Sequence, residues 1–113
     1  MSPSDLLERA RAHWEAGRYE EAIPCLQAAK CEFPLEAGHL LGRCLMKVQV
    51  FNLALKELIA AREAAGPEHR SQVKEITYML GRIYEAAKEP DKAIAEYRRI
   101  LELDRGPDGG STG

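Results

Sequence analysis

Residues 17–23 read Gly17-Arg18-Tyr19-Glu20-Glu21-Ala22-Ile23, and altered copies of this segment follow at residues 49–55 and 88–94. Each copy ends in a small residue followed by a branched apolar one. The copies begin at residues 17, 49 and 88, so they are 32 and then 39 residues apart. Self-similarity at such a spacing is typical of a repeat architecture, in which each unit buries its apolar face against the next.

A second motif precedes the later copies. It reads Leu41-Gly42-Arg43-Cys44 and Leu80-Gly81-Arg82-Ile83, and Arg9-Ala10-Arg11-Ala12 occupies the matching place before the first copy. Between these motifs the apolar residues recur every three or four positions, which indicates amphipathic helices and not strands. We therefore predict an all-α chain with helices near residues 4–16, 19–32, 35–48, 51–65, 69–88 and 90–104.

Two places leave the helix boundaries open. Pro24 lies about one turn into the second predicted helix, where its missing N–H and its ring should bend that helix or delay its start. The segment Gly66-Pro67-Glu68-His69-Arg70 lengthens the connection between the second and third repeats. It forms either a loop or an extension of the fifth helix.

Composition and charge narrow the function classes. The chain has 113 residues, 45% of them hydrophobic, and a net charge of -2 from nearly balanced signs. It fits one soluble globular domain, and its balanced charge gives no field that would recruit nucleic acid or an anionic membrane. No stretch comes near the roughly eighteen uncharged apolar residues of a membrane-spanning helix, and the first residues lack signal-peptide features. We expect a cytoplasmic protein, and the Ala-, Arg- and Glu-rich composition favours a bacterial source.

Residue types that carry chemistry are present but do not form a recognisable site. No two histidines are three or four positions apart, as a zinc site on one helix face would require. The odd number of cysteines favours free thiols that act as small buried hydrophobes. We expect no enzyme activity, no bound metal and no cofactor. The histidines and cysteines concerned are His13, His39, His69, Cys25, Cys31 and Cys44.

Taken together, the motifs resemble the tetratricopeptide repeat family over residues 4–105. The helix-turn-helix unit of that family carries a Leu-Gly pair and an aromatic residue in its first helix, then Ala, a large apolar residue, Ala and a closing Pro. The second unit here places Leu41, Gly42, Leu45, Ala54, Leu58, Ala61 and Gly66 in those positions. The resemblance implies an α-solenoid of three antiparallel helix pairs without a capping helix, with units at about residues 3–34, 35–68 and 69–105. Residues 106–113 are expected to be a flexible tail or linker.

The repeat spacing has a steric reason within each helix pair. Small residues such as Gly42 and Gly81 let the two helices approach closely, while Leu58 and Tyr97 fill the space beside them. A bulky side chain at either glycine should force the pair apart.

The resemblance also implies that the first helix of each pair lines a concave groove. The residue after the Leu-Gly position is then arginine in all three units, and the other groove residues are aromatic or apolar. We expect the groove to bind a protein or peptide with acidic and apolar side chains. Two alternatives remain: each arginine pairs with a glutamate of its own chain, and Trp14 packs as a core or edge residue. The predicted groove residues are Leu7, Arg11, Trp14, His39, Arg43, Met46, Tyr78 and Arg82.

One subclass of the family clamps a C-terminal carboxylate of chaperones with Lys, Asn, Asn, Lys and Arg. Compared position by position, none of the five matching places in this chain holds the residue that the clamp requires. A chaperone tail is therefore not the expected ligand. The matching places hold Leu7, Arg11, Leu40, Glu75 and Met79.

The sixth predicted helix carries Ile94, Leu101 and Leu103 on the side that would receive a further unit. Apolar surface of this kind is usually covered. We expect either that the chain is a piece of a longer protein, or that this face binds a second copy, to form a homodimer, or a partner. The sequence therefore favours an interaction adaptor, with a self-associating structural module as the alternative.

Overall fold

The computed structural model describes residues 1–105, and all regular structure in that range is helical. Each predicted helix is present, with ends within three residues of those expected. The predicted flexible tail, residues 106–113, lies outside the described residues. The α-helices are α1 (Pro3–Glu15), α2 (Tyr19–Ala29), α3 (Pro34–Lys47), α4 (Phe51–Ala64), α5 (Arg70–Ala86) and α6 (Pro90–Arg105), with a 3₁₀ turn η1 (Pro67–His69) before α5.

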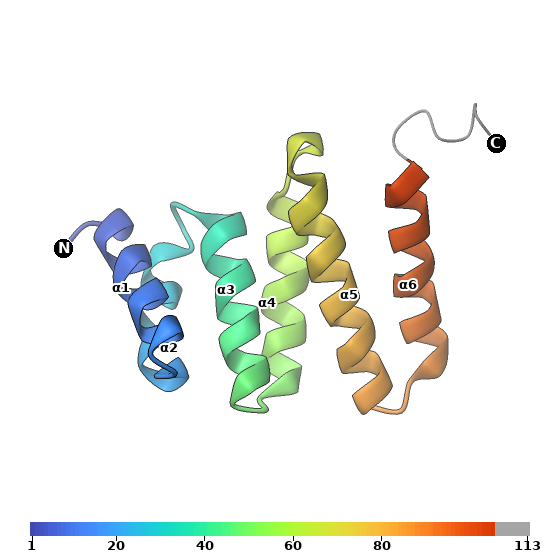
Figure 1. The fold of residues 1–113 in the computed structure, drawn as a ribbon, viewed down its shortest axis with the longest axis horizontal. Helices are drawn as coiled ribbons and strands as arrows, with labels where there is room; N and C mark the ends of the chain where they lie inside the picture. The colour runs from blue at the N-terminus through green and yellow to red at the C-terminus, as the bar shows by residue number, and fades with distance from the viewer. Residues whose placement is uncertain (106–113) are drawn as a thin grey trace. The chain divides into compact units, whose positions relative to one another are not determined.

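The first four helices form one compact unit, Met1–Ala65. In it α1 packs against α2, α2 against α3, and α3 against α4 (Figure 1). Leu26, Leu41 and Leu58 are fully buried at the centre, together with small alanines of the facing helices. The apolar stripes predicted from the sequence thus form the core of this unit.

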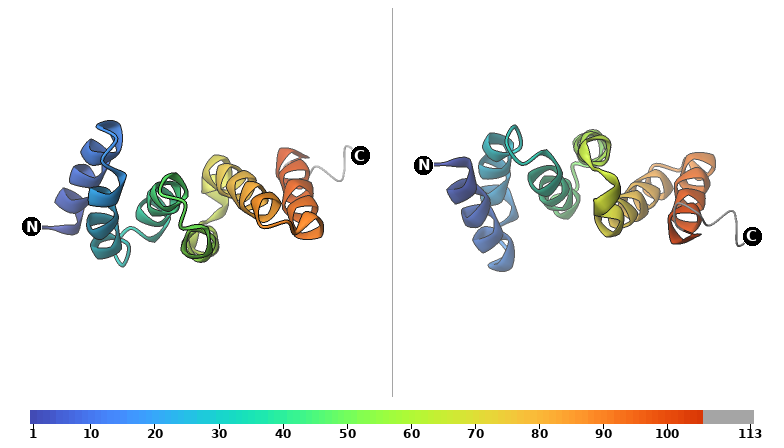
Figure 2. Two further views of the ribbon diagram at one scale, coloured as in Figure 1. Left: turned by 90° about the horizontal axis from the view of Figure 1, so that it is seen from below. Right: turned by 90° about the horizontal axis from the view of Figure 1, so that it is seen from above.

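A second compact unit begins at Gly66 and contains η1, α5 and α6. The two views in Figure 2 show α5 and α6 side by side. Ile76, Thr77 and Leu80 are its most deeply buried residues. The connection after Gly66 is a single 3₁₀ turn that leads at once into α5. It is thus intermediate between the two expected forms, a loop and a longer helix.

A capping box defines the start of α1. The Ser2 hydroxyl accepts a hydrogen bond from the Asp5 N–H, and the Asp5 carboxylate accepts one from the Ser2 N–H, both at 3.2 Å. Pro3 occupies the first turn, where a helix has no backbone hydrogen bond to lose. The hydrogen bonds from Ser2 lower the pKa of Asp5, because they stabilise its ionised form.

The helix pairs are joined by three turns of the same construction. In each, one residue adopts a positive φ: 80° at Gly17, 65° at Gln49 and 61° at Lys88. The N–H of the following residue then donates to the carbonyl five positions earlier, which is the hydrogen bond of a Schellman motif. These bonds are Arg18 to His13 at 2.8 Å, Val50 to Leu45 at 2.8 Å and Glu89 to Tyr84 at 2.9 Å. The sequence repeat is therefore also a repeat of local backbone structure.

Close approach within the pairs depends on glycine, as the repeat spacing predicted. A Cβ atom on Gly42 would overlap the side chain of Leu58, and one on Gly81 would overlap the ring of Tyr97. Gly38 is similarly restricted, since its Cβ would lie 2.9 Å from the Cβ of Ala61. These contacts confirm the expected packing of α3 on α4 and of α5 on α6.

Pro24 and a buried ion pair are two further features of the first unit. Helix α2 begins at Tyr19 with Pro24 inside it, so the proline does not delay the helix start. Glu57 is 8% exposed in α4, and Lys30 at the end of α2 donates to both of its carboxylate oxygens at 3.2 and 2.9 Å. This ion pair satisfies the buried carboxylate and ties α2 to α4.

Candidate functional site

Four side chains of the first unit form a cluster of two aromatic rings and two cations, which we call the Trp14 cluster: Trp14, Tyr19, Arg43 and Lys47. The ring centroids of Trp14 and Tyr19 are 4.9 Å apart in an edge-to-face arrangement. The guanidinium carbon of Arg43 lies 4.5 Å from the centroid of Trp14. The Lys47 ammonium lies 6.0 Å from Trp14 and 5.8 Å from Tyr19, so both cations contact aromatic faces.

The repeat places these residues together. Trp14 is in the last turn of α1, and the positive φ of Gly17 reverses the chain so that Tyr19, the first residue of α2, packs against the indole ring. Arg43 and Lys47 are four positions apart on α3, which puts them on one side of that helix. The cluster therefore joins the first helices of two neighbouring pairs.

Arg11, the arginine of the first repeat, pairs with Glu36 of α3 at 2.9 Å. The two side chains are 53% and 48% exposed. An ion pair this exposed contributes at most about 1 kcal/mol to stability. Here the structure matches the alternative in which an arginine pairs with a glutamate of its own chain.

Arg82 on α5 belongs to a polar and aromatic group of the second unit. Its Nη1 donates to the Tyr78 hydroxyl at 3.3 Å, and its guanidinium lies 5.9 Å from the Tyr78 ring. The Tyr97 hydroxyl donates to Glu85 at 2.6 Å. The hydrogen bond to Tyr78 raises the pKa of Arg82, while burial and the bond to Glu85 raise the pKa of Tyr97 to about 12.

The remaining predicted groove residues differ in exposure. Trp14, Arg43 and Met46 are half-buried, whereas Tyr78 is 49% exposed. Leu7 and His39 are 5% and 9% exposed, so they are part of the interior and offer little surface to a ligand.

Sequence reasoning did not single out Tyr19 and Lys47 as members of a site. One signal was available, since Lys47 stands one helical turn after Arg43. The position of Tyr19 depends on the geometry of the turn at Gly17, which the sequence pattern did not specify.

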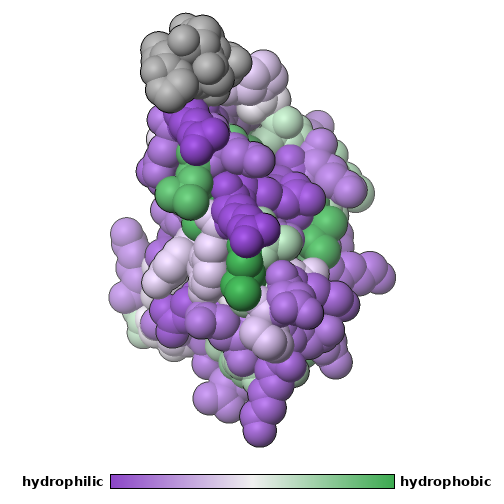
Figure 3. Space-filling model, turned by 90° about the vertical axis from the view of Figure 1, so that its right-hand side faces the viewer, coloured by the Kyte–Doolittle hydropathy of each residue, from purple (hydrophilic) through white to green (hydrophobic). Residues whose placement is uncertain are grey.

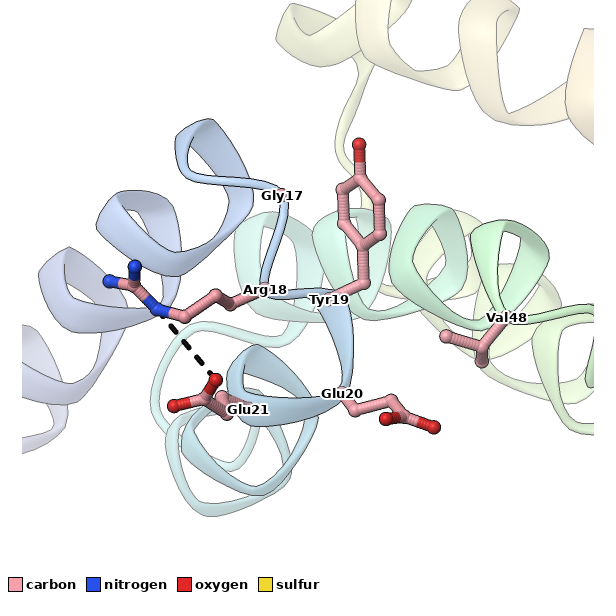
Figure 4. Close-up of a pocket in the computed structure, with 6 residues that line it drawn as sticks. All are labelled: Gly17, Arg18, Tyr19, Glu20, Glu21 and Val48. Atoms are coloured by element: carbon pink, nitrogen blue, oxygen red, sulfur yellow. Dashed lines mark ion pairs between the residues drawn. The ribbon is translucent and has the colours of Figure 1, made fainter.

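Beside the α1–α2 turn lies an open pocket of about 210 Å³ (Figure 4). The Arg18 and Glu21 side chains point toward one another there, with Nε and Oε1 3.7 Å apart, while Tyr19 points away from them. Arg18 Nε also donates to His13 Nδ1 at 3.0 Å. The charges of Arg18 and Glu21 therefore largely compensate each other. The pocket is lined by Gly17, Arg18, Tyr19, Glu20, Glu21 and Val48.

The structure separates the three residues of the predicted self-association face. Ile94 and Leu101 are 48% and 61% exposed and stand two turns apart on one side of α6. Leu103 is half-buried and lies about 200° around the helix from Leu101, in line with the buried Glu96. Figure 3 faces the side where α6 lies and shows hydrophobic side chains separated by hydrophilic ones. The outward apolar face therefore consists of Ile94 and Leu101.

The cysteines are all free. Cys44 is buried, and burial raises the pKa of its thiol to about 11, whereas Cys31 is exposed and Cys25 half-buried. In residues 1–105, no three His, Cys, Asp or Glu side chains gather in a way that could hold a metal ion. The helices of the same residues include none that is long and apolar enough to cross a membrane.

Comparisons with known proteins agree with this geometry. Residues 7–46 and 39–109 match a family model described as tetratricopeptide repeat. The fold is similar to the crystal structure of MamA, with a TM-score of 0.80 at 22% sequence identity. That match covers 94% of this chain and 60% of the MamA chain, so the chain spans about 60% of the length of that neighbour. A search of curated protein sequences finds no significant match.

The family match covers most of the chain, and the structural match shows an all-α solenoid of helix pairs. Repeats of this family are protein-interaction modules and are typically non-enzymatic. The chain belongs to the tetratricopeptide repeat family.

Proposed function

We propose that this chain is an adaptor that binds a partner protein or peptide on the face formed by the first helices of its pairs, α1 and α3 in the first unit. The observation that carries the proposal is Arg43 stacked 4.5 Å over the half-buried Trp14. Tryptophan and arginine dominate the energetic centres of protein interfaces, because they combine large apolar area with directed polar groups. The Arg43 guanidinium lies over the Trp14 ring, and the planar fork of a guanidinium suits a carboxylate.

The other predicted groove residues have graded roles in this proposal. Met46 is half-buried beside the cluster and offers an adaptable apolar contact. Arg11 is held by Glu36, so its contribution requires a ligand carboxylate to compete with an exposed ion pair. Tyr78 and Arg82 present the same combination of ring and guanidinium in the second unit. Leu7 and His39 support the face from the interior.

Charge reversal of the three arginines tests the proposal. The variant Arg11→Glu/Arg43→Glu/Arg82→Glu should lose a partner that the wild-type chain captures from native cell extract. A matched control reverses three exposed cations elsewhere, Lys56, Arg70 and Arg98, and so carries the same change of charge. Both variants should keep the helical circular dichroism of the wild type. Equal capture of the partner by the arginine variant and the control would reject the groove.

A second candidate function is self-association through α6, favoured by the outward exposure of Ile94 and Leu101. Such a homodimer should become monomeric when Leu101→Glu places a charge at the centre of this face. Sedimentation equilibrium at high protein concentration measures the change directly. A wild-type chain that is already monomeric at high protein concentration would reject this alternative.

The cytoplasmic location stays a prediction.

A further inference from the structure

The first repeat is polar at a place where the later repeats are buried. Leu41 and Leu80 stand at this place in the second and third repeats, and both are fully buried. The first repeat has Arg9 there, and Arg9 is exposed. Terminal units of solenoids carry polar outer faces of this kind, because water and not another repeat covers them. The first repeat is therefore a poor docking surface for an apolar face of another copy.

Helix α6 presents an exposed stripe of five residues, which we call the α6 stripe: Asp91, Ile94, Arg98, Leu101 and Arg105. Their spacing alternates between three and four positions, which puts them on one side of the helix. The two apolar residues lie on either side of Arg98, and the two ends carry opposite charges. Neither end has an ion-pair partner within residues 1–105. Figure 3, which faces this side, shows hydrophobic side chains set between hydrophilic ones.

We infer that the α6 stripe binds the α6 stripe of a second copy, with the two helices antiparallel about a twofold axis at Arg98. The stripe is complementary to itself in this arrangement. Ile94 of one copy meets Leu101 of the other, and Asp91 meets Arg105. Symmetry makes each contact twice and closes the assembly at two copies. This inference rests on the self-association proposed above and specifies its arrangement.

Two other arrangements of a second copy are less favourable. Parallel stripes would place Asp91 against Asp91 and Arg105 against Arg105, and like charges in contact weaken association. A head-to-tail contact would bring the apolar residues of the stripe against the polar first repeat around Arg9. The antiparallel pair leaves one like-charge contact, between the two Arg98 side chains. The exposed Glu102, one turn along each helix, supplies the opposite charge there.

Sedimentation equilibrium of the full chain over a range of protein concentrations tests the inference. We expect a monomer–dimer equilibrium, and a weak one, because the apolar part of the stripe is small. Asp91→Arg and Arg105→Asp should each raise the dissociation constant about tenfold, since symmetry turns two attractive contacts into two repulsive ones. Glu63→Arg and Arg70→Asp are matched controls, because they make the same changes of charge at exposed positions outside α6. Both controls should leave the dissociation constant unchanged.

The double variant Asp91→Arg/Arg105→Asp separates the contact between copies from an effect on the helix itself. Each exchange places an unfavourable charge at one end of α6, so the double variant should be no more helical than either single variant by circular dichroism. In the antiparallel dimer the double variant again pairs opposite charges. It should therefore regain the dissociation constant of the wild type.

The outcomes separate this inference from self-association in general. A wild-type chain that stays monomeric at high concentration, or a dimer that survives Leu101→Glu, would overturn both. A dimer that Leu101→Glu disrupts, but that Asp91→Arg weakens no more than Glu63→Arg does, would overturn the antiparallel arrangement and leave self-association through α6 standing. Failure of the double variant to regain the dimer would overturn the arrangement in the same way. Species larger than a dimer that grow with concentration would show a head-to-tail chain and would also overturn the inference.

Discussion

Replacing Gly42 with alanine should destabilise the first unit, although the same change in an open helix is stabilising. In an unhindered helix interior, alanine is better than glycine by roughly 1 kcal/mol. Here the added Cβ would overlap the side chain of Leu58, which is fully buried and cannot turn toward solvent. Overpacking of this kind costs roughly 1–3 kcal/mol, and the confinement of Leu58 places this site in the upper part of that range. We expect a net loss of about 1–2 kcal/mol in the free energy of unfolding.

A double-mutant cycle makes the prediction sharper, because the sign of the effect should reverse. In a Leu58→Ala background the space beside residue 42 is open, so Gly42→Ala should stabilise by about 1 kcal/mol through helix propensity. The parallel change Gly81→Ala should cost less than Gly42→Ala, because the half-buried ring of Tyr97 can turn outward.

Urea unfolding followed by the fluorescence of Trp14 measures the stability of the first unit directly, since that residue belongs to it. The Gly81 variant requires circular dichroism, which reports on both units. If Gly42→Ala raises the free energy of unfolding of the otherwise wild-type chain, the close packing of α3 on α4 is refuted. An unchanged sign in the Leu58→Ala background would show that the added methyl group meets something other than Leu58.

Three further predictions follow from local features. Gln49→Gly and Lys88→Gly should each raise the free energy of unfolding by about 0.5 kcal/mol, because both residues hold a positive φ; urea titration checks this, and destabilisation would contradict it. Iodoacetamide should alkylate Cys31 in the folded chain and Cys44 only after unfolding, as mass spectrometry of the peptides would show. Since the folded chain raises the pKa of Tyr97 to about 12, ionisation favours the unfolded chain between about pH 10 and 12. Stability should fall in that window, and it should fall less for Tyr97→Phe; an equal loss in both proteins would reject the cause.

Much of the fold could be predicted from the sequence, because local signals and packing signals coincide in the repeat. The glycines of the Leu-Gly pairs mark the close helix contacts, and each turn residue with a positive φ is the first residue of a repeated segment. The behaviour of Pro24 was harder to predict, since its cost to helix α2 competes with the burial of Leu26 and its neighbours. The periodicity of the apolar residues likewise did not show that the connection after Gly66 forms a short 3₁₀ turn.

The candidate site could be predicted less well, because it depends on the direction of side chains. The register of the repeat placed Arg11, Arg43 and Arg82 in equivalent positions but did not show that each has a different neighbour. The burial of Leu7 depends on how closely the surrounding helices approach. Leu103 shows the same effect on α6, where a difference of two positions from Leu101 moves a residue to the opposite side of the helix.

The central claim is that the face of α1 and α3 binds the partner, and chemical-shift mapping by nuclear magnetic resonance tests it most directly. The single indole N–H of Trp14 gives one resolved signal in the spectrum of the labelled chain. On addition of the partner, we expect this signal and the backbone signals around Arg43 and Lys47 to shift, while those around Leu101 stay in place. Shifts confined to α6 around Ile94 and Leu101, with an unchanged Trp14 signal, would contradict the account.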